Sequence, residues 1–164
     1  MTKRLTRMGL LTALALIIFS IEAQIPPPVP IPGVKLGLSN IITVYAMFCL
    51  GPKDTLLILL VRIFLGSIFT GQMMALAFSF CGGMLCYLVM LLMRHIVTEN
   101  QIWVCSVVGA IAHNAGQIIA AIITTNTPGL VVYLPILLIS GIAAGLFTGL
   151  VAQFTIHRMK KIQH

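Results

Sequence analysis

Two ionisable side chains, Arg62 and His113, each lie near the middle of an apolar stretch, in a chain that is 59% hydrophobic and only 8% charged. An ionisable group at bilayer depth costs at least about 2.5 kcal/mol on insertion scales, so it tends to face a cavity, a partner or a substrate. A guanidinium can supply charge to an anionic ligand. The placement therefore predicts a buried polar site inside a membrane protein.

The composition excludes a soluble domain. The mean hydropathy is +1.09, and the three acidic residues, Glu22, Asp54 and Glu99, cannot furnish a solvated surface. No residue from 101 to 157 is formally charged when histidine is neutral. That stretch exceeds the roughly 20 residues of one span and contains a turn signal at residues 126–129, so two spans fit it.

We expect one all-α integral membrane domain over residues 1–164, with six transmembrane helices. The expected helices are roughly 6–24, 38–51, 54–70, 73–93, 102–123 and 130–156. Gly51-Pro52 interrupts the pattern between the second and third of these. An alternative with four helices would merge residues 38–70 into one tilted span, with Lys53 and Asp54 in its middle.

The basic residues favour a cytoplasmic position for both termini. Six spans with the N-terminus inside place eight basic residues on the cytoplasmic side: Lys3, Arg4, Arg7, Lys53, Arg94, Arg158, Lys160 and Lys161. Lys35 alone lies outside. This bias follows the positive-inside tendency of short loops. The net charge of +7 then reflects topology and anionic lipid, and no nucleic-acid partner is expected.

With this topology, polar residues gather in the outer half of the bundle. The candidate substrate-binding residues are Glu22, Lys35, Asn40, Arg62, His113, Asn114 and Gln117. His113 and Gln117, four residues apart, share one helical face. Arg62 or Lys35 can supply charge to a polar or anionic ligand, and the amides can orient it.

The outer loop of residues 25–37 contains five of the eight prolines. Proline fixes φ and removes a backbone donor, so we expect an extended, stiff strap. Two interpretations remain open: a rigid connector, or a lid over an outward-facing pocket.

The polar residues also have structural interpretations. Arg62 can pair with Glu22 or with carbonyls at a helix end. His113 and Asn114 can form interhelical hydrogen bonds, which average about 0.6 kcal/mol each in membranes. A redox role for His113 as a haem ligand is a further alternative, although no second buried histidine is available as the opposite axial ligand.

Small residues recur every four positions in three of the expected helices. The sets are Gly141, Gly145 and Gly149; Ala112, Gly116 and Ala120; and Gly9 with Ala13. Such ridges let helices approach closely in lipid. They can pack helices within the monomer or contact a partner subunit.

The sequence offers little for catalysis. Three scattered acids cannot form the carboxylate clusters that hold Mg²⁺ against a diphosphate, and no P-loop, HExxH or dinucleotide-binding turn is present. The four cysteines lack CxxC spacing and are expected to be packing residues. We therefore expect no enzyme activity, no cofactor and no metal.

Residues 25–41, with Lys35-Leu36-Gly37-Leu38-Ser39-Asn40, together with residues 112–117 and Tyr133-Leu134-Pro135, resemble the Gx transporter family. That family is often labelled heptaprenyl diphosphate synthase component I. It in turn resembles the S-components of energy-coupling-factor transporters, six-helix proteins that capture vitamins or related compounds from outside. The resemblance implies an S-component-like bundle in a bacterial plasma membrane.

The same resemblance implies partners: a transmembrane coupling subunit and two ATPase subunits, contacted through Gly9 and Ala13. The ligand would be a small vitamin-like, isoprenoid or quinone-related compound. Two alternatives remain open. The chain can be a membrane subunit of a flavin- and quinone-linked extracellular electron-transfer system, or a non-catalytic accessory subunit of a prenyl diphosphate synthase.

Overall fold

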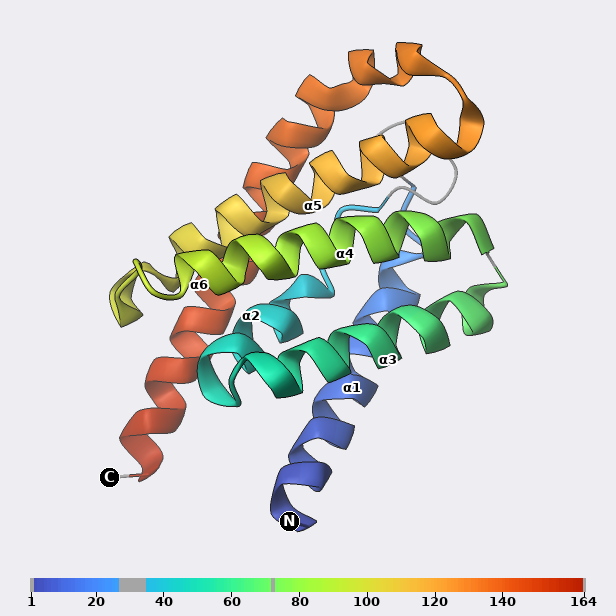
Figure 1. The fold of residues 1–164 in the computed structure, drawn as a ribbon. Helices are drawn as coiled ribbons and strands as arrows, with labels where there is room; N and C mark the ends of the chain where they lie inside the picture. The colour runs from blue at the N-terminus through green and yellow to red at the C-terminus, as the bar shows by residue number, and fades with distance from the viewer. Residues whose placement is uncertain (1, 27–34, 72, 164) are drawn as a thin grey trace.

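The computed structural model describes residues 2–26, 35–71 and 73–163, and within these ranges the chain is helical (Figure 1). The elements are α1 (Thr2–Glu22), α2 (Asn40–Cys49), α3 (Pro52–Thr70), α4 (Met73–Met93), the 3-10 helix η1 (Glu99–Gln101), α5 (Ile102–Thr125), the 3-10 helix η2 (Pro128–Tyr133) and α6 (Leu134–Gln163). No strand occurs in the described ranges, so the all-α prediction is confirmed. The predicted strap over residues 25–37 lies largely outside them.

Within the described residues, four helical segments are long and apolar enough to cross a membrane. They are Thr2–Glu22, Leu76–Met93, Glu99–Thr125 and Pro128–Lys161. Many large apolar side chains on these and neighbouring helices face outward, including Phe69 at 71% exposure and Ile139 at 70%. Because an aqueous surface does not tolerate so many exposed apolar groups, this surface indicates a membrane protein.

The prediction of six spanning helices is not confirmed, and α2 shows why. Its 10 residues rise only about 15 Å, half of the roughly 30 Å hydrocarbon core. The 19 residues of α3 are long enough, but they include Lys53, Asp54 and Arg62. The expected helix over 38–51 is therefore a short helix.

Residues 38–70 do not form the single helix that the four-helix alternative assumes. Gly51 separates α2 from α3 with a φ of 97°, in the left-handed region that a residue without a Cβ adopts readily. Pro52 then begins α3. Proline lacks a backbone N–H, but an N–H in the first turn of a helix has no intrahelical acceptor, so no hydrogen bond is lost there. The chain reverses direction between α2 and α3 (Figure 1).

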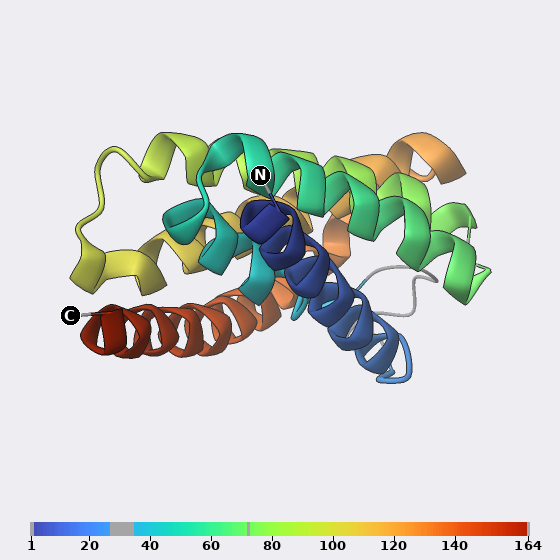
Figure 2. The ribbon, with the colours of Figure 1, turned by 90° about the horizontal axis from the view of Figure 1, so that it is seen from below.

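Helix α5 lies between α4 and α6, and α1 packs mainly against α3 (Figures 1 and 2). The glycine ridge of α6 makes its contact with α5 possible. A Cβ added at Gly145 would stand 2.8 Å from the Val107 Cα, and one at Gly149 would stand 2.7 Å from the Trp103 Cα. The ridge therefore packs helices within the monomer.

Several interactions join elements at the end of the molecule that holds both chain termini. Arg4 of α1 pairs with Asp54 of α3, and Lys160 of α6 pairs with Glu99 of η1. The Tyr45 hydroxyl of α2 lies 2.8 Å from the Met159 sulfur of α6. The start of α1, the α2–α3 turn, the α4–α5 connection and the end of α6 thus lie at a common end.

Candidate functional site

The last turn of α1 holds the segment that leads into α2. Both oxygens of the Glu22 carboxylate accept backbone hydrogen bonds, one from the Gly37 N–H and one from the Ser39 N–H at 3.4 Å. Glu22 itself is only 3% exposed. A charge-assisted bond of this kind contributes about 1.5–3 kcal/mol, so Glu22 fixes the position of residues 37–39 against α1.

Arg62 reaches the same segment from the middle of α3. Its guanidinium donates to the Ser39 hydroxyl and to the Asn40 side-chain oxygen, the latter at 3.5 Å. Within the described residues no ion pair joins Arg62 to Glu22. Both side chains instead contact Ser39: Glu22 accepts a hydrogen bond from its backbone N–H, and Arg62 donates one to its hydroxyl. The direct Arg62–Glu22 pair, which we considered as a structural interpretation, is therefore replaced by a bridge through Ser39, a residue that the sequence did not single out.

Gly37 brings this segment against α5. A Cβ at Gly37 would stand 2.9 Å from the Asn40 Nδ2 and 3.3 Å from the His113 Cδ2. Gly37 also has a φ of 82°, which L side chains rarely adopt. The backbone can approach the imidazole of His113 this closely only because residue 37 is glycine.

His113 and Gln117 share the face of α5 that packs on α4, as their spacing predicts. A Cβ at Gly82 of α4 would stand 3.1 Å from the His113 Nδ1 and 2.9 Å from the Gln117 Cγ. His113 is 4% exposed and Gln117 is fully buried. Two helices therefore approach each other at the level where both polar side chains lie.

Asn114 faces a different neighbour. Its amide donates to the Leu137 carbonyl of α6 and lies directly against Gly141 of the α6 ridge. This is the interhelical hydrogen bond that we considered as an alternative. This contact of Asn114 points away from the 35–40 segment.

Lys35 completes the cluster from the loop before α2. Its ammonium lies 3.5 Å from the centroid of the Phe19 ring, a cation–π contact, and the residue is 8% exposed. Burial is the main cause that lowers the pKa of Lys35; the Glu22 carboxylate opposes this shift and the Arg62 charge adds to it.

Several buried polar atoms of the cluster make no hydrogen bond within the described part of the chain. They are the Lys35 Nζ, the Asn40 Nδ2, the Arg62 Nε, the His113 Nδ1, the Asn114 Oδ1 and both amide atoms of Gln117. Each such atom costs roughly 1–3 kcal/mol when it stays unpaired. Most of them are nitrogens, so the cluster can donate to an anionic or polar group.

The structure thus buries all seven predicted residues. It brings five of them together at the 35–40 segment, while Gln117 lies against Gly82 of α4 and Asn114 binds α6. Sequence reasoning missed Gly37, Ser39 and Gly82. Gly37 and Ser39 belong to the same short Lys-Leu-Gly-x-x-Asn element as Lys35 and Asn40, so this element was the available signal for them. Gly82 carried none.

The two residues predicted to contact a partner lie elsewhere, on α1. Gly9 and Ala13 are both exposed, and a Cβ added at Gly9 would meet no atom within 4 Å. Unlike the α6 ridge, this pair packs no helix in the described structure.

Fold and site together define a helical membrane protein with a buried, largely cationic polar cluster. A family model described as heptaprenyl diphosphate synthase component I matches residues 11–155. The chain belongs to this family, which confirms the predicted resemblance. No curated protein and no solved structure matches the chain.

Proposed function

We propose that this chain is the substrate-binding subunit of an uptake transporter of the energy-coupling-factor type. It captures a small polar or anionic compound from outside the cell. The observation that carries the proposal is the set of buried polar atoms around Arg62, His113 and Gln117 that have no hydrogen-bond partner among the described residues. Leaving so many donors without partners is unfavourable, and a bound ligand with acceptor oxygens would satisfy them.

The charge balance of the cluster supports an anionic group in the ligand. Two cations, Lys35 and Arg62, are buried with a single carboxylate, Glu22, whose oxygens already accept two backbone N–H groups. A carboxylate or phosphate on the ligand would offset the remaining positive charge. The vitamin-like, isoprenoid and quinone-related compounds implied by the resemblance differ in this respect, and those that carry an anionic group fit best.

We further propose that both termini are cytoplasmic and that the chain crosses a bacterial plasma membrane six times. The end that joins Arg4, Asp54, Glu99 and Lys160 holds both termini, as this topology requires, and it is rich in basic residues. In this topology α2 accounts for only part of its crossing.

The proposed partners are a transmembrane coupling subunit and two ATPase subunits. The open α1 surface at Gly9 and Ala13 supports such a contact, because small residues let a partner helix approach closely. Replacing Gly9 with Leu should then reduce assembly with the coupling subunit and leave ligand binding intact.

Mass spectrometry of the compounds that co-purify with the protein from its native membrane, in mild detergent, tests the proposal. The wild type should retain a polar or anionic compound that Arg62→Ala and His113→Ala lose. Arg94→Ala is the matched control, since Arg94 follows the last residue of α4 and makes no contact with the cluster residues in the described structure. Size-exclusion chromatography shows which variants remain folded, and Gln117→Leu supplies a further variant that removes no charge. Unchanged retention in all three site variants would refute the site.

The family description favours a second candidate, a non-catalytic accessory subunit of a prenyl diphosphate synthase. The acids are not arranged to hold Mg²⁺ against a diphosphate: Asp54 pairs with Arg4, Glu99 with Lys160, and Glu22 binds backbone amides. An accessory role would therefore leave the chemistry to a partner. It predicts that deletion lowers long-chain prenyl diphosphate synthesis in membranes without an uptake defect.

A further inference from the structure

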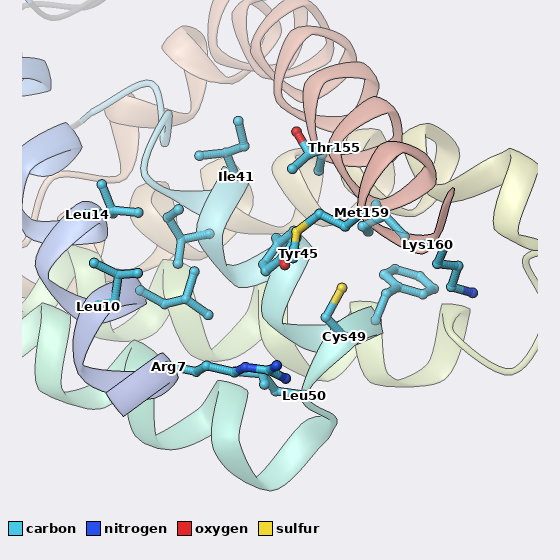
Figure 3. A pocket seen from close by; sticks show the side chains of 15 residues that line it. Arg7, Leu10, Leu14, Ile41, Tyr45, Cys49, Leu50, Thr155, Met159 and Lys160 are labelled. Atoms are coloured by element: carbon cyan, nitrogen blue, oxygen red, sulfur yellow. Dashed lines mark hydrogen bonds between the residues drawn. The ribbon is translucent and has the colours of Figure 1, made fainter. Parts of the chain in front are cut away.

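A groove of about 610 Å³ runs along α2, from Ile41 and Ile42 next to Asn40 of the polar cluster to Cys49 and Leu50 at the end of the molecule that holds both termini. Its volume is in the range of about 300–1,000 Å³ that ligand pockets occupy. Figure 3 shows Leu10 and Leu14 of α1 on one side, Thr155 and Met159 of α6 on the other, and Tyr45 of α2 between them. Helices α1 and α6 form the walls and α2 forms the floor.

The walls of the groove are apolar and open to the surroundings. Leu10 is 62% exposed and Leu14 is 41% exposed. Both wall helices are candidate membrane spans, so the groove opens sideways into the bilayer. A hydrocarbon chain is the occupant that these side chains favour, since contact with it removes them from polar surroundings.

One end of the groove is basic. Arg7 extends from α1 across that end toward Leu50 (Figure 3), and Lys160 of α6 lines it as well. No carboxylate occurs among the lining residues. Lys160 also pairs with Glu99, but both side chains are more than half exposed, and an exposed pair of this kind contributes only about 0–1 kcal/mol. Both cations therefore remain available to an anion.

We propose that this groove is a binding site for one anionic phospholipid. The phosphate lies between Arg7 and Lys160, and an acyl chain runs along Leu10, Leu14 and Tyr45. The occupant combines the two properties that the groove shows, an anionic head at the basic end and a hydrocarbon tail along the apolar walls. If the termini are cytoplasmic, the lipid comes from the inner leaflet. The site shares no residue with the polar cluster and does not depend on the proposed uptake function.

Native mass spectrometry of the delipidated, full-length protein in detergent tests this site. The protein is titrated with phosphatidylglycerol and, in a parallel titration, with zwitterionic phosphatidylcholine. We expect one saturable phosphatidylglycerol site that is tighter than any phosphatidylcholine site. Removing one basic residue near a lipid surface should weaken binding about fivefold, so Arg7→Gln should show a change of that size.

Arg158→Gln is the matched control. Arg158 lies two residues before Lys160 on α6, but it does not line the groove, and its guanidinium lies 5.4 Å from the Phe154 ring centroid. It should bind phosphatidylglycerol as the wild type does. Leu14→Trp narrows the groove without changing its charge, and it should weaken binding of the lipid as well. Arg7 and Leu14 are both exposed, so neither substitution disturbs the core.

Four results would overturn the proposal. Equal affinity for the two lipids, or equal losses in Arg7→Gln and Arg158→Gln, would show that the basic end attracts lipid without a built site. Selective binding of a single-chain polyprenyl phosphate in place of phosphatidylglycerol would assign the groove to another amphiphile. If a co-purified protein segment cross-links to Leu14 and excludes lipid, the groove is a protein interface.

Discussion

Replacing Gly149 with Ala should destabilise the contact between α5 and α6, whereas the same change at Gly9 should not. A Cβ at Gly149 would stand 2.7 Å from both the Trp103 Cα and the Ser106 Cβ. One of these atoms belongs to the backbone, so no rotamer change relieves the overlap. The two helices would have to move apart by several tenths of an ångström, and the packing between them would loosen.

The size of the effect follows from two opposing contributions. Overpacking of this kind costs about 1–3 kcal/mol, and Ala regains about 1 kcal/mol over Gly in a helix. The net loss for Gly149→Ala is thus about 0–2 kcal/mol, which lowers the apparent Tm by up to about 8 °C for a chain of this size. At Gly9, where a Cβ meets no atom within 4 Å, only the helix-propensity gain applies.

The assay is the fraction of monodisperse protein that survives heating in mild detergent, measured by size-exclusion chromatography. We expect Gly149→Ala to lose its monomer peak at a lower temperature than the wild type, and Gly9→Ala at the same or a higher temperature. Identical melting of the two variants would contradict the claim that the α6 ridge is in close contact with α5 while α1 presents an open surface.

Three further predictions concern the polar cluster and the basic end of the molecule. Glu22→Gln keeps the shape of the side chain but removes the charge from the acceptor of two backbone hydrogen bonds. Limited proteolysis should therefore cut near residue 37 faster than in the wild type. An unchanged cutting rate would show that Glu22 does not hold residues 37–39 in place. Gly37→Ala introduces a side chain at positive φ and against His113. Retention of the co-purified compound should therefore fall at least tenfold while the protein stays monodisperse. Full retention would refute the close approach of residue 37 to His113. Glu99→Gln breaks an exposed pair with Lys160 that is worth about 0–1 kcal/mol; a Tm change of more than a few degrees would show that the pair matters more than its exposure implies.

The sequence predicted the helices well because their signal is local. Hydropathy and the Gly51-Pro52 break located all six helices within a few residues. The largest differences lie in the last helix, where residues 128–133 form η2 and α6 continues to Gln163. The length of α2 was also misjudged. Apolar composition continues through residues 38–51, and composition alone does not show that only 10 of these residues are helical.

The site was predicted less completely, because contacts between distant residues decide it. His113 and Asn114 are neighbours in the chain, yet adjacent residues on a helix do not face each other. His113 therefore meets α4 and the 37–40 segment, while Asn114 binds α6. Likewise, the bridge through Ser39 depends on where α1 and α3 place Glu22 and Arg62, which no local pattern reveals.

The packing between the two ends of the molecule bears on how a captured compound would leave the outer site. Toward the opposite end from Arg62, the bundle is filled by a continuous apolar core that includes Met47, Leu59, Met90 and Cys105, each at most 1% exposed. Interiors packed in this way have few voids larger than a water molecule. A polar ligand bound near Arg62 therefore has no path through the resting bundle, and its release inward requires helices to separate. Such a rearrangement exposes buried apolar surface and needs an energy source. If the chain is the proposed uptake subunit, the proposed coupling subunit and ATPases would supply this energy.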